Sequence, residues 1–291
     1  MPVLTPHCFP MDTPTPSLRT PRPWVYALVL ALLSIAVFSA VWRAEFVEWE
    51  NKVNIYENPH VRGLTADTVR WAFTDVSYVP RYMPLGWLSY AASCHLSGLN
   101  PVAHHAGNLL LHALNTVMVF FLARRLLSLA ATPRASAAND ESPTATAAWL
   151  RPDWGAVAVT LLWAVHPLRV ETVALASARI YCQAAALALA CVLAWFRAQD
   201  AAPGSGRRRG WLVVSVLAYV ASLLTYPIAM TLPAALIVID AFLLRRFADG
   251  VLRGGGWSYG APVFLSASYR TSAHPSYRDF DTGFRCARTA R

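Results

Sequence analysis

Ionisable side chains are scarce in this sequence of 291 residues: only 14% are Asp, Glu, Lys or Arg, whereas 56% are hydrophobic. Soluble globular domains carry about a quarter charged residues, so the shortage argues against a soluble protein. Burial in lipid accounts for it, because an ionised side chain at the centre of a bilayer is costly. The composition therefore predicts a membrane protein.

Two further absences exclude other classes. The five cysteines form no CxxC pair and no metal-ligand spacing, so we expect neither a disulfide framework nor a zinc site. The net charge of +9 is mostly arginine, without a lysine-rich tract or an arginine–aromatic ladder. Nucleic acid is therefore not an expected partner. The arginines lie in short clusters between apolar runs, as in proteins that use them to set membrane orientation.

Six apolar runs are long enough, or nearly so, to cross a bilayer. They are residues 24–42, 107–127, 154–173, 181–196, 211–225 and 228–244. The first run is longer than a typical signal core and lacks a small-x-small cleavage site, which favours an uncleaved anchor over a signal peptide. Pro227 separates the last two runs, which form either a hairpin or a broken helix. We expect an all-α polytopic membrane protein with about six transmembrane helices.

Arginine clusters then set the orientation. They are Arg19 and Arg22; Arg124, Arg125, Arg134 and Arg151; Arg197 with Arg207 to Arg209; and Arg245 and Arg246. All fall on one side if the N-terminus is cytoplasmic, as the positive-inside rule requires. Residues 1–22, rich in Pro and Thr, then form a disordered cytoplasmic N-terminus, and residues 43–105 form an outward loop. Within this loop, residues 84–99, with Trp87 and Tyr90, are expected to form an interfacial helix.

Three groups of polar residues lie at the outer ends of the expected spans. The first is Glu50 with Asn51; the second is His105, Asn108, His112 and Asn115; the third is His166, Glu171 and Arg179. The second group has a 3-4-3 spacing and so lines one helical face. Such a stripe faces protein or water rather than lipid, which fits a site but also fits hydrogen bonding between helices. Glu50 is equally compatible with simple exposure, and Glu171 with an ion pair to Arg179.

The outer loop and the following helices resemble a known family. The stretches that carry the resemblance are Asn58-Pro59-His60-Val61, Gly63-Leu64-Thr65, residues 69–74, Tyr82-Met83-Pro84-Leu85-Gly86-Trp87, residues 98–101, residues 108–115 and His166-Pro167-Leu168-Arg169-Val170-Glu171. They are similar to bacterial membrane proteins related to the transmembrane and tetratricopeptide-repeat O-mannosyltransferases, which have the C-type glycosyltransferase fold. The similarity covers about residues 46–246, and residues 23–246 are expected to form this transmembrane domain.

This resemblance implies a transferase in the bacterial inner membrane. It would move a sugar from a polyprenyl-phosphate donor to a protein or other acceptor on the outer face, amid membrane lipid. Glu50 and Asn51 stand where the family has an acidic pair, which implies a catalytic role as general base or as ligand of a divalent metal. No cofactor is certain otherwise. His105, His112, His166, Glu171 and Arg179 are assigned to substrate binding.

Two departures from the family favour an alternative. Asn51 is an amide where the family has a second carboxylate, and Tyr181 stands where it usually has an acidic residue. The chain also stops before the family's later spans and repeats. A non-catalytic membrane scaffold, or a protein that binds lipid-linked sugar without turnover, is the alternative function.

The last residues resemble a different family. The stretches Val251-Leu252-Arg253-Gly254-Gly255-Gly256-Trp257, Ser266-Ala267-Ser268-Tyr269-Arg270 and Gly283-Phe284-Arg285-Cys286-Ala287-Arg288 are similar to the end of formylglycine-generating-enzyme-like domains, which have a C-type-lectin-like fold. Residues 247–291 are expected to be a fragment of such a domain. Residues 258–264 lack the cysteines of the active enzymes, so no sulfatase-modifying activity is expected. The tail is then a remnant, a fusion or assembly junction, or a segment that completes another chain; a membrane-tethered lectin-like binder is a weaker alternative.

Overall fold

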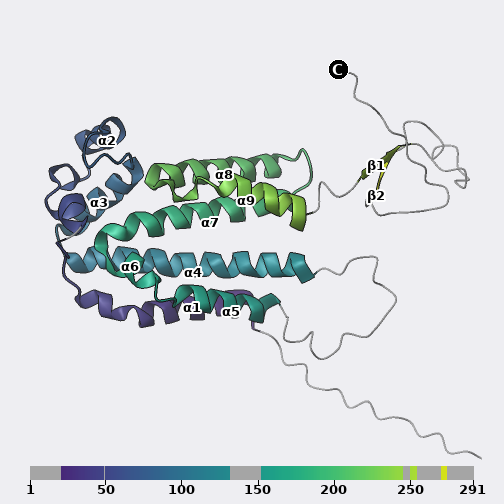
Figure 1. The fold of residues 1–291 in the computed structure, drawn as a ribbon, viewed down its shortest axis with the longest axis horizontal. Coiled ribbons are helices and arrows are strands. Elements are labelled where there is room, and N and C mark those ends of the chain that lie inside the picture. The colour runs from purple at the N-terminus through teal and green to yellow at the C-terminus, as the bar shows by residue number, and fades with distance from the viewer. Residues whose placement is uncertain (1–20, 49, 132–151, 245–249, 254–269, 274–291) are drawn as a thin grey trace, which may run out of the picture.

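The computed structural model describes residues 21–48, 50–131, 152–244, 250–253 and 270–273. Every regular element between residues 21 and 244 in this part of the chain is helical (Figure 1). The α-helices are α1 (Pro23–Val37), α2 (Ala66–Thr74), α3 (Pro84–Ser97), α4 (Pro101–Ala131), α5 (Pro152–Ala164), α6 (Arg169–Ala174), α7 (Arg179–Gln199), α8 (Gly206–Thr225) and α9 (Leu232–Val238). Shorter helical turns are η1 (Ser39–Arg43), η2 (Lys52–Tyr56), η3 (Pro59–Val61), η5 (Ala176–Ala178), η6 (Pro227–Ala229) and η7 (Ile239–Leu243).

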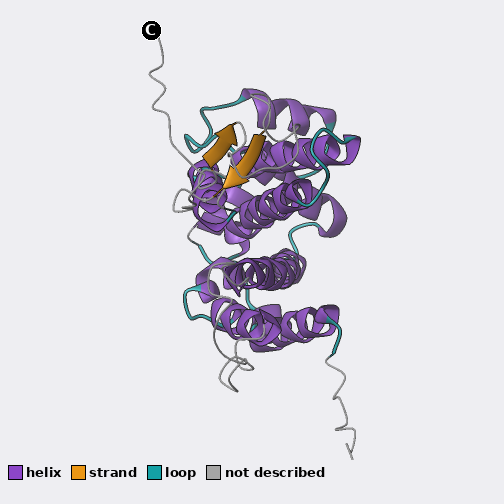
Figure 2. Cartoon of the chain, turned by 90° about the vertical axis from the view of Figure 1, so that its right-hand side faces the viewer, coloured by secondary structure: helices purple, strands orange, loops and turns teal. Residues whose placement is uncertain are grey.

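Helix α4 is the centre of the bundle. It packs against α1 and α5 on one side and against α7 on the other, and α7 in turn packs against α8 (Figures 1 and 2). Along the chain, α1, α4, α5, α7, α8 and α9 alternate in direction along the long axis of the bundle, although α5 and α9 cover only part of its length (Figure 1). Helices α2, α3 and α6 therefore gather at one end, which we call the outer end.

In the described part of the chain, three helical stretches are long and apolar enough to cross a membrane: α4, α7 with the preceding turn (Ala176–Gln199), and α8. Three shorter apolar helices accompany them, at Pro23–Val37, Asp153–Ala164 and Pro227–Phe242. The length of α4, α7 and α8, and the apolar composition of all these helices, are typical of a membrane protein. Each short helix coincides with one of the six runs expected from the sequence, although none of the three reaches spanning length by itself.

Side chains are distributed inside out compared with a soluble protein. Large apolar side chains point outward from α1, α5, α8 and α9; examples are Leu32, Leu162, Leu217 and Ile237. Small and polar side chains lie inside and join helices through backbone acceptors. The Ser222 hydroxyl donates to the Ala184 carbonyl over 2.8 Å. Polar groups in hydrocarbon need such partners, so this packing fits a bundle surrounded by lipid.

Helix α3 is not the interfacial helix expected from residues 84–99. Trp87 and Tyr90 are fully buried, and they join Ile55, Met83 and Ile180 in the core at the outer end. Gly86 permits this close packing, because a Cβ there would lie 2.8 Å from Ile180 Cγ2. The aromatic residues of this helix therefore stabilise the outer loop rather than anchor it in headgroups.

The described part of the tail is one antiparallel ribbon, in which β1 (Gly250–Arg253) pairs with β2 (Arg270–Ala273). The register places Val251 opposite Ser272. The other tail residues lie outside the described part of the chain, as do most of residues 1–22. The ribbon alone gives no support to a lectin-like fragment.

Candidate functional site

Glu50 lies in a cleft at the outer end. A helical segment starts at Glu50 and continues into the π-turn η2, and π-turns are frequent at functional sites. Glu50 Oε1 lies 3.2 Å from Arg81 Nη2. The cleft has a volume of about 370 Å³. Its lining residues are Glu48, Glu50, Val53, Asn54, Val79 and Arg81.

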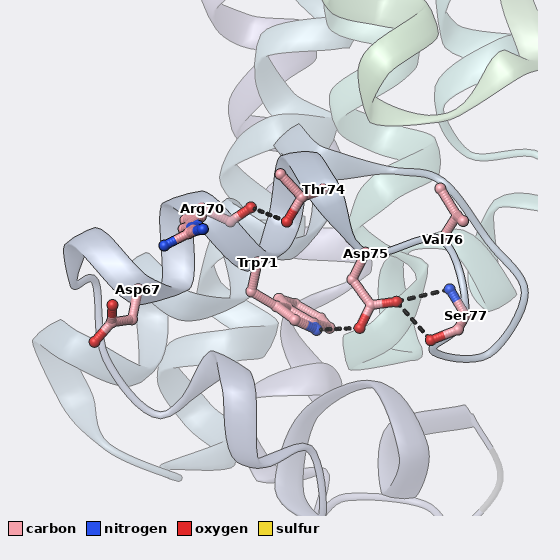
Figure 3. Close-up of a pocket in the computed structure, with 7 residues that line it drawn as sticks. All are labelled: Asp67, Arg70, Trp71, Thr74, Asp75, Val76 and Ser77. Carbon is pink, nitrogen blue, oxygen red and sulfur yellow. Dashed lines mark hydrogen bonds between the residues drawn. The ribbon is translucent and has the colours of Figure 1, made fainter.

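Arg81 is held beside Glu50 by a tightly bonded turn. Asp75 Oδ1 accepts from the Ser77 backbone N–H and hydroxyl, both over 2.7 Å, and Asp75 Oδ2 accepts from the Trp71 ring N–H over 2.8 Å (Figure 3). Hydrogen bonds from Ser77 lower the pKa of Asp75 to about 2. Further along the turn, Val79 has a φ of 52°, which is strained for a β-branched residue. The turn therefore fixes the direction in which Arg81 enters the cleft.

Glu50 and Arg81 also attract each other electrostatically. Burial alone would lower the pKa of Arg81, but the hydrogen bond and the charge of Glu50 outweigh this and raise it. The Tyr226 and Tyr181 phenols lie close enough to act on the Arg81 charge as well. Their rings contact each other at a centroid distance of 5.0 Å. The cleft thus combines a partly exposed carboxylate, a cation and neighbouring phenols.

Asn51 lies next to Glu50 in sequence but points away from the cleft. Its side chain is fully buried, and its Oδ1 accepts from the Ser177 backbone N–H over 2.9 Å. This bond ties the Glu50 segment to η5, directly before α7. The catalytic role expected for Asn51 becomes a positioning role, because its amide does not reach the cleft.

Replacing Asn51 by leucine should lower the free energy of unfolding by about 1–3 kcal/mol, because the buried Ser177 N–H would lose its acceptor. Thermal unfolding of the purified protein in detergent measures the effect. Asn54→Leu is the matched control, since Asn54 is buried in the same segment but its Oδ1 accepts no hydrogen bond. Equal losses in the two variants would contradict the role of the Asn51–Ser177 bond.

Arg179 lies in the interior rather than at the cleft. Its side chain is almost fully buried and donates to Asn108 Oδ1 over 3.3 Å and to the carbonyls of Ser89 and His104 over 3.1 and 2.8 Å. It also donates to the Ser93 hydroxyl. These partners belong to α3 and α4, so Arg179 joins three helices. Its donors are directed to protein groups, which does not fit the expected contact with substrate.

The expected histidines do not converge on the cleft. His105 is buried, with its ring centroid 6.5 Å from that of Phe46. His112 Nε2 donates to the Ala164 carbonyl over 3.0 Å, and its ring stacks on Trp163. His112 therefore forms a hydrogen bond between helices, which is the structural alternative to a role in a site. Asn115 does the same through the Cys182 carbonyl, over 2.9 Å.

His166 is exposed in the turn after α5, and Glu171 is exposed on the short helix α6. His166 Nδ1 accepts from the Leu168 N–H over 3.2 Å and so closes a turn. Glu171 is exposed and Arg179 is buried, and the described ion pairs do not join them. The structure thus brings together Glu50 and Arg81, of which the sequence argument named only Glu50.

The side chains at the cleft do not fit a metal ion. Among the described residues, no three His, Cys, Asp or Glu side chains gather as a metal site would require. Glu50 is paired with Arg81, and the Asn51 amide accepts from Ser177 instead. The divalent metal implied by the resemblance therefore has no ligand set in the described part of the chain.

Comparisons of the chain with protein-family models, with curated proteins and with solved structures found no match. The residues of the site and the sequence resemblance are therefore the basis on which the function of the chain is inferred. Arg81 was missed because its partner lies 31 residues earlier in the chain. The one local signal was the Asp75–Ser77 pair, since Asp followed two residues later by Ser is typical of a side-chain-stabilised turn.

Proposed function

We propose that this chain is a membrane glycosyltransferase-like protein with a partial C-type glycosyltransferase fold. It would transfer a sugar from a polyprenyl-phosphate donor to a protein or other acceptor. The supporting observation is the position of Glu50, a partly exposed carboxylate in a cleft at the outer end of an apolar bundle. A base placed there meets both a donor headgroup at the membrane boundary and an acceptor from the aqueous side.

The proposal includes six spans in the bacterial inner membrane. The alternating direction of α1, α4, α5, α7, α8 and α9 supports it (Figure 1), as does the apolar character of the three shorter helices. Arg124, Arg125 and Arg197, with Arg207 to Arg209, lie near the helix ends opposite the outer end. Arg124 Nε pairs there with Asp153 Oδ1 over 2.5 Å. By the positive-inside rule these clusters next to the helix ends support a cytoplasmic location for the opposite end.

The chemistry would use Glu50 as a general base. Its carboxylate takes the proton of an acceptor hydroxyl while the acceptor oxygen forms a bond to the anomeric carbon. The bond from this carbon to the phosphate oxygen breaks, and polyprenyl phosphate leaves with the electron pair. Arg81, freed from Glu50 when that carboxylate is protonated, is the cation placed to stabilise the phosphate. Arg179 is not needed for this step.

A second candidate is a protein that binds lipid-linked sugar, or serves as a scaffold, without catalysis. Asn51 supports it, because the position of the family's second carboxylate holds a buried amide bonded to Ser177. The Glu50–Arg81 pair also occupies the carboxylate in the absence of substrate. Both functions share the cleft and differ in turnover.

A transfer assay separates the two. The full chain in vesicles is given radiolabelled polyprenyl-phosphate mannose and an acceptor peptide rich in Ser and Thr. Glycosyl transfer is expected to yield labelled peptide. Retention of the labelled lipid without product would support the binding function, and neither binding nor transfer with a panel of polyprenyl-phosphate sugars would refute both.

A further inference from the structure

A second cleft lies on α2, and no step of the proposed chemistry uses it. It has a volume of about 540 Å³, within the roughly 300–1,000 Å³ that is typical of ligand sites. We call it the α2 pocket; its lining residues are Asp67, Arg70, Trp71, Thr74, Asp75, Val76 and Ser77 (Figure 3). Asp67, Arg70 and Thr74 follow a 3-4 spacing, so they share one face of the helix. Asp75 and Ser77 come from the turn that follows it.

The Trp71 ring is a rigid part of the α2 pocket. Its ring N–H donates to Asp75 Oδ2 over 2.8 Å, and the His60 ring stacks on it with a centroid distance of 4.4 Å. In Figure 3 the Trp71 ring lies between the Asp67 and Arg70 side chains on one side and the Asp75 turn on the other. A ligand would therefore meet a preformed apolar surface with polar groups at both ends.

Asp67 and Arg70 are the ionic groups of the α2 pocket that can still bind a ligand. Both are exposed, and neither side chain makes an ion pair or a hydrogen bond to another described residue. Asp75 has no such freedom, because both of its oxygens already accept hydrogen bonds. The Thr74 hydroxyl donates to the Arg70 carbonyl over 2.8 Å, so its oxygen can still accept. The pocket thus offers donors at Arg70 and acceptors at Asp67 and Thr74.

The balance of charges and hydrogen-bonding groups selects the kind of ligand. Two carboxylates and one guanidinium line the pocket, which disfavours a phosphate or another anion. A cation would meet Arg70, and a purely apolar ligand would leave Asp67 and Arg70 without partners. A sugar avoids these conflicts, because its neighbouring hydroxyls can donate to Asp67 and Thr74 and accept from Arg70. Its C–H groups can contact Trp71 and Val76.

We infer that the α2 pocket binds a neutral sugar unit, with Arg70 as hydrogen-bond donor and Asp67 as acceptor. The turn that follows α2 borders this pocket and, through Arg81, also borders the Glu50 cleft. The pocket is thus a second carbohydrate subsite, beside the proposed reaction centre. Its use in transfer rests on the proposed function, whereas the binding of sugar does not.

Saturation-transfer NMR tests the binding without any glycosyl transfer. The full chain is placed in nanodiscs of phosphatidylethanolamine and phosphatidylglycerol, free of sugar-based detergent. The probes are the methyl glycosides of mannose, glucose, galactose and N-acetylglucosamine at millimolar concentration. Asp67→Asn and Arg70→Gln change the pocket. Arg62→Gln is the matched control, at an exposed arginine of the same loop that does not line the pocket, and Glu50→Gln reports on the Glu50 cleft.

We expect the wild-type chain to transfer saturation to at least one glycoside. Asp67→Asn and Arg70→Gln should each weaken its binding by about tenfold or more, because a hydrogen bond to a charged group is lost. Arg62→Gln and Glu50→Gln should bind as the wild type does. Two exposed pocket positions keep the comparison valid if one variant folds poorly.

Three results would overturn the inference. They are no saturation transfer to any of the glycosides, an equal loss of binding in Arg62→Gln, and a loss of binding in Glu50→Gln alone. The last result would place the sugar in the Glu50 cleft instead. Sugar binding that depends on Asp67 and Arg70, in a chain that transfers no sugar, would support the subsite and contradict only the proposed transferase.

Discussion

Glu50→Gln is expected to reduce glycosyl transfer by about 10²–10⁴-fold, the usual contribution of a general base. Glutamine has nearly the same shape as glutamate but cannot accept the proton of the acceptor hydroxyl. The substitution also removes the 3.2 Å ion pair with Arg81. Because both side chains are partly exposed, that pair is worth only about 0–1 kcal/mol, so the fold should persist. The initial rate with radiolabelled polyprenyl-phosphate mannose in vesicles measures the loss.

Glu57→Gln is the matched control. Glu57 also belongs to the outer loop and also pairs with a cation, Lys52, over 3.4 Å, but it does not line the cleft. Its loss should leave the rate unchanged. A Glu50→Gln protein that transfers at the wild-type rate would rule out Glu50 as the base. Equal losses in both variants would mean that the outer loop responds to any change of charge.

The helical, apolar character of the chain could be predicted from the sequence because it follows from local composition. A helix lies in each of the six apolar runs, although only three helical stretches in the described part of the chain are long and apolar enough to cross a membrane. Pro84 and Pro101 begin α3 and α4, and proline is favoured at the first turn of a helix. The polar stripe of α4 was also correct as a pattern: Asn108, His112 and Asn115 are all buried on one face.

The directions in which side chains point at the outer end could not be predicted. They depend on contacts between residues that are far apart in the sequence. Arg179 meets Ser89 and His104, which are 90 and 75 residues away. Trp87 has the composition of a headgroup anchor, but Ile55 and Ile180 enclose it in the core cluster. Composition and spacing contain no information on which of two apolar surroundings, lipid or protein, such a ring enters.

The same limit explains why residues 84–99 were expected to form an interfacial helix. The stretch is longer than α2 and contains Trp87 and Tyr90, which are typical of headgroup contacts. In the structure this helix is enclosed between α2, α4, α7 and α8, and the shorter α2 is left at the surface. Contacts with other helices, rather than the composition of the stretch itself, therefore decide that residues 84–99 are buried.

Arg179→Met is expected to lower the free energy of unfolding by about 3 kcal/mol, the usual cost of an unsatisfied buried acceptor plus an imperfectly filled site. Methionine fills part of the space but cannot donate to Asn108, Ser89 or His104. Arg179→Lys should recover little, because an ammonium group cannot reach acceptors on two helices at once. Thermal unfolding in detergent, followed by circular dichroism, measures the change.

Gly107 tests the same packing without altering Arg179. A Cβ at position 107 would lie 2.9 Å from Arg179 Nη2 and 3.2 Å from its Cζ, so Gly107→Ala must displace the guanidinium. The expected cost is about 1–3 kcal/mol, as for overpacking of a core. Gly210→Ala in α8 is the control, since a Cβ there meets no atom within 4 Å. Arg62→Met, at an exposed arginine that donates to the Tyr56 carbonyl, should cost far less than Arg179→Met. If these arginine variants unfolded at the same temperature, Arg179 would not be the residue that holds α3 and α4 against α7.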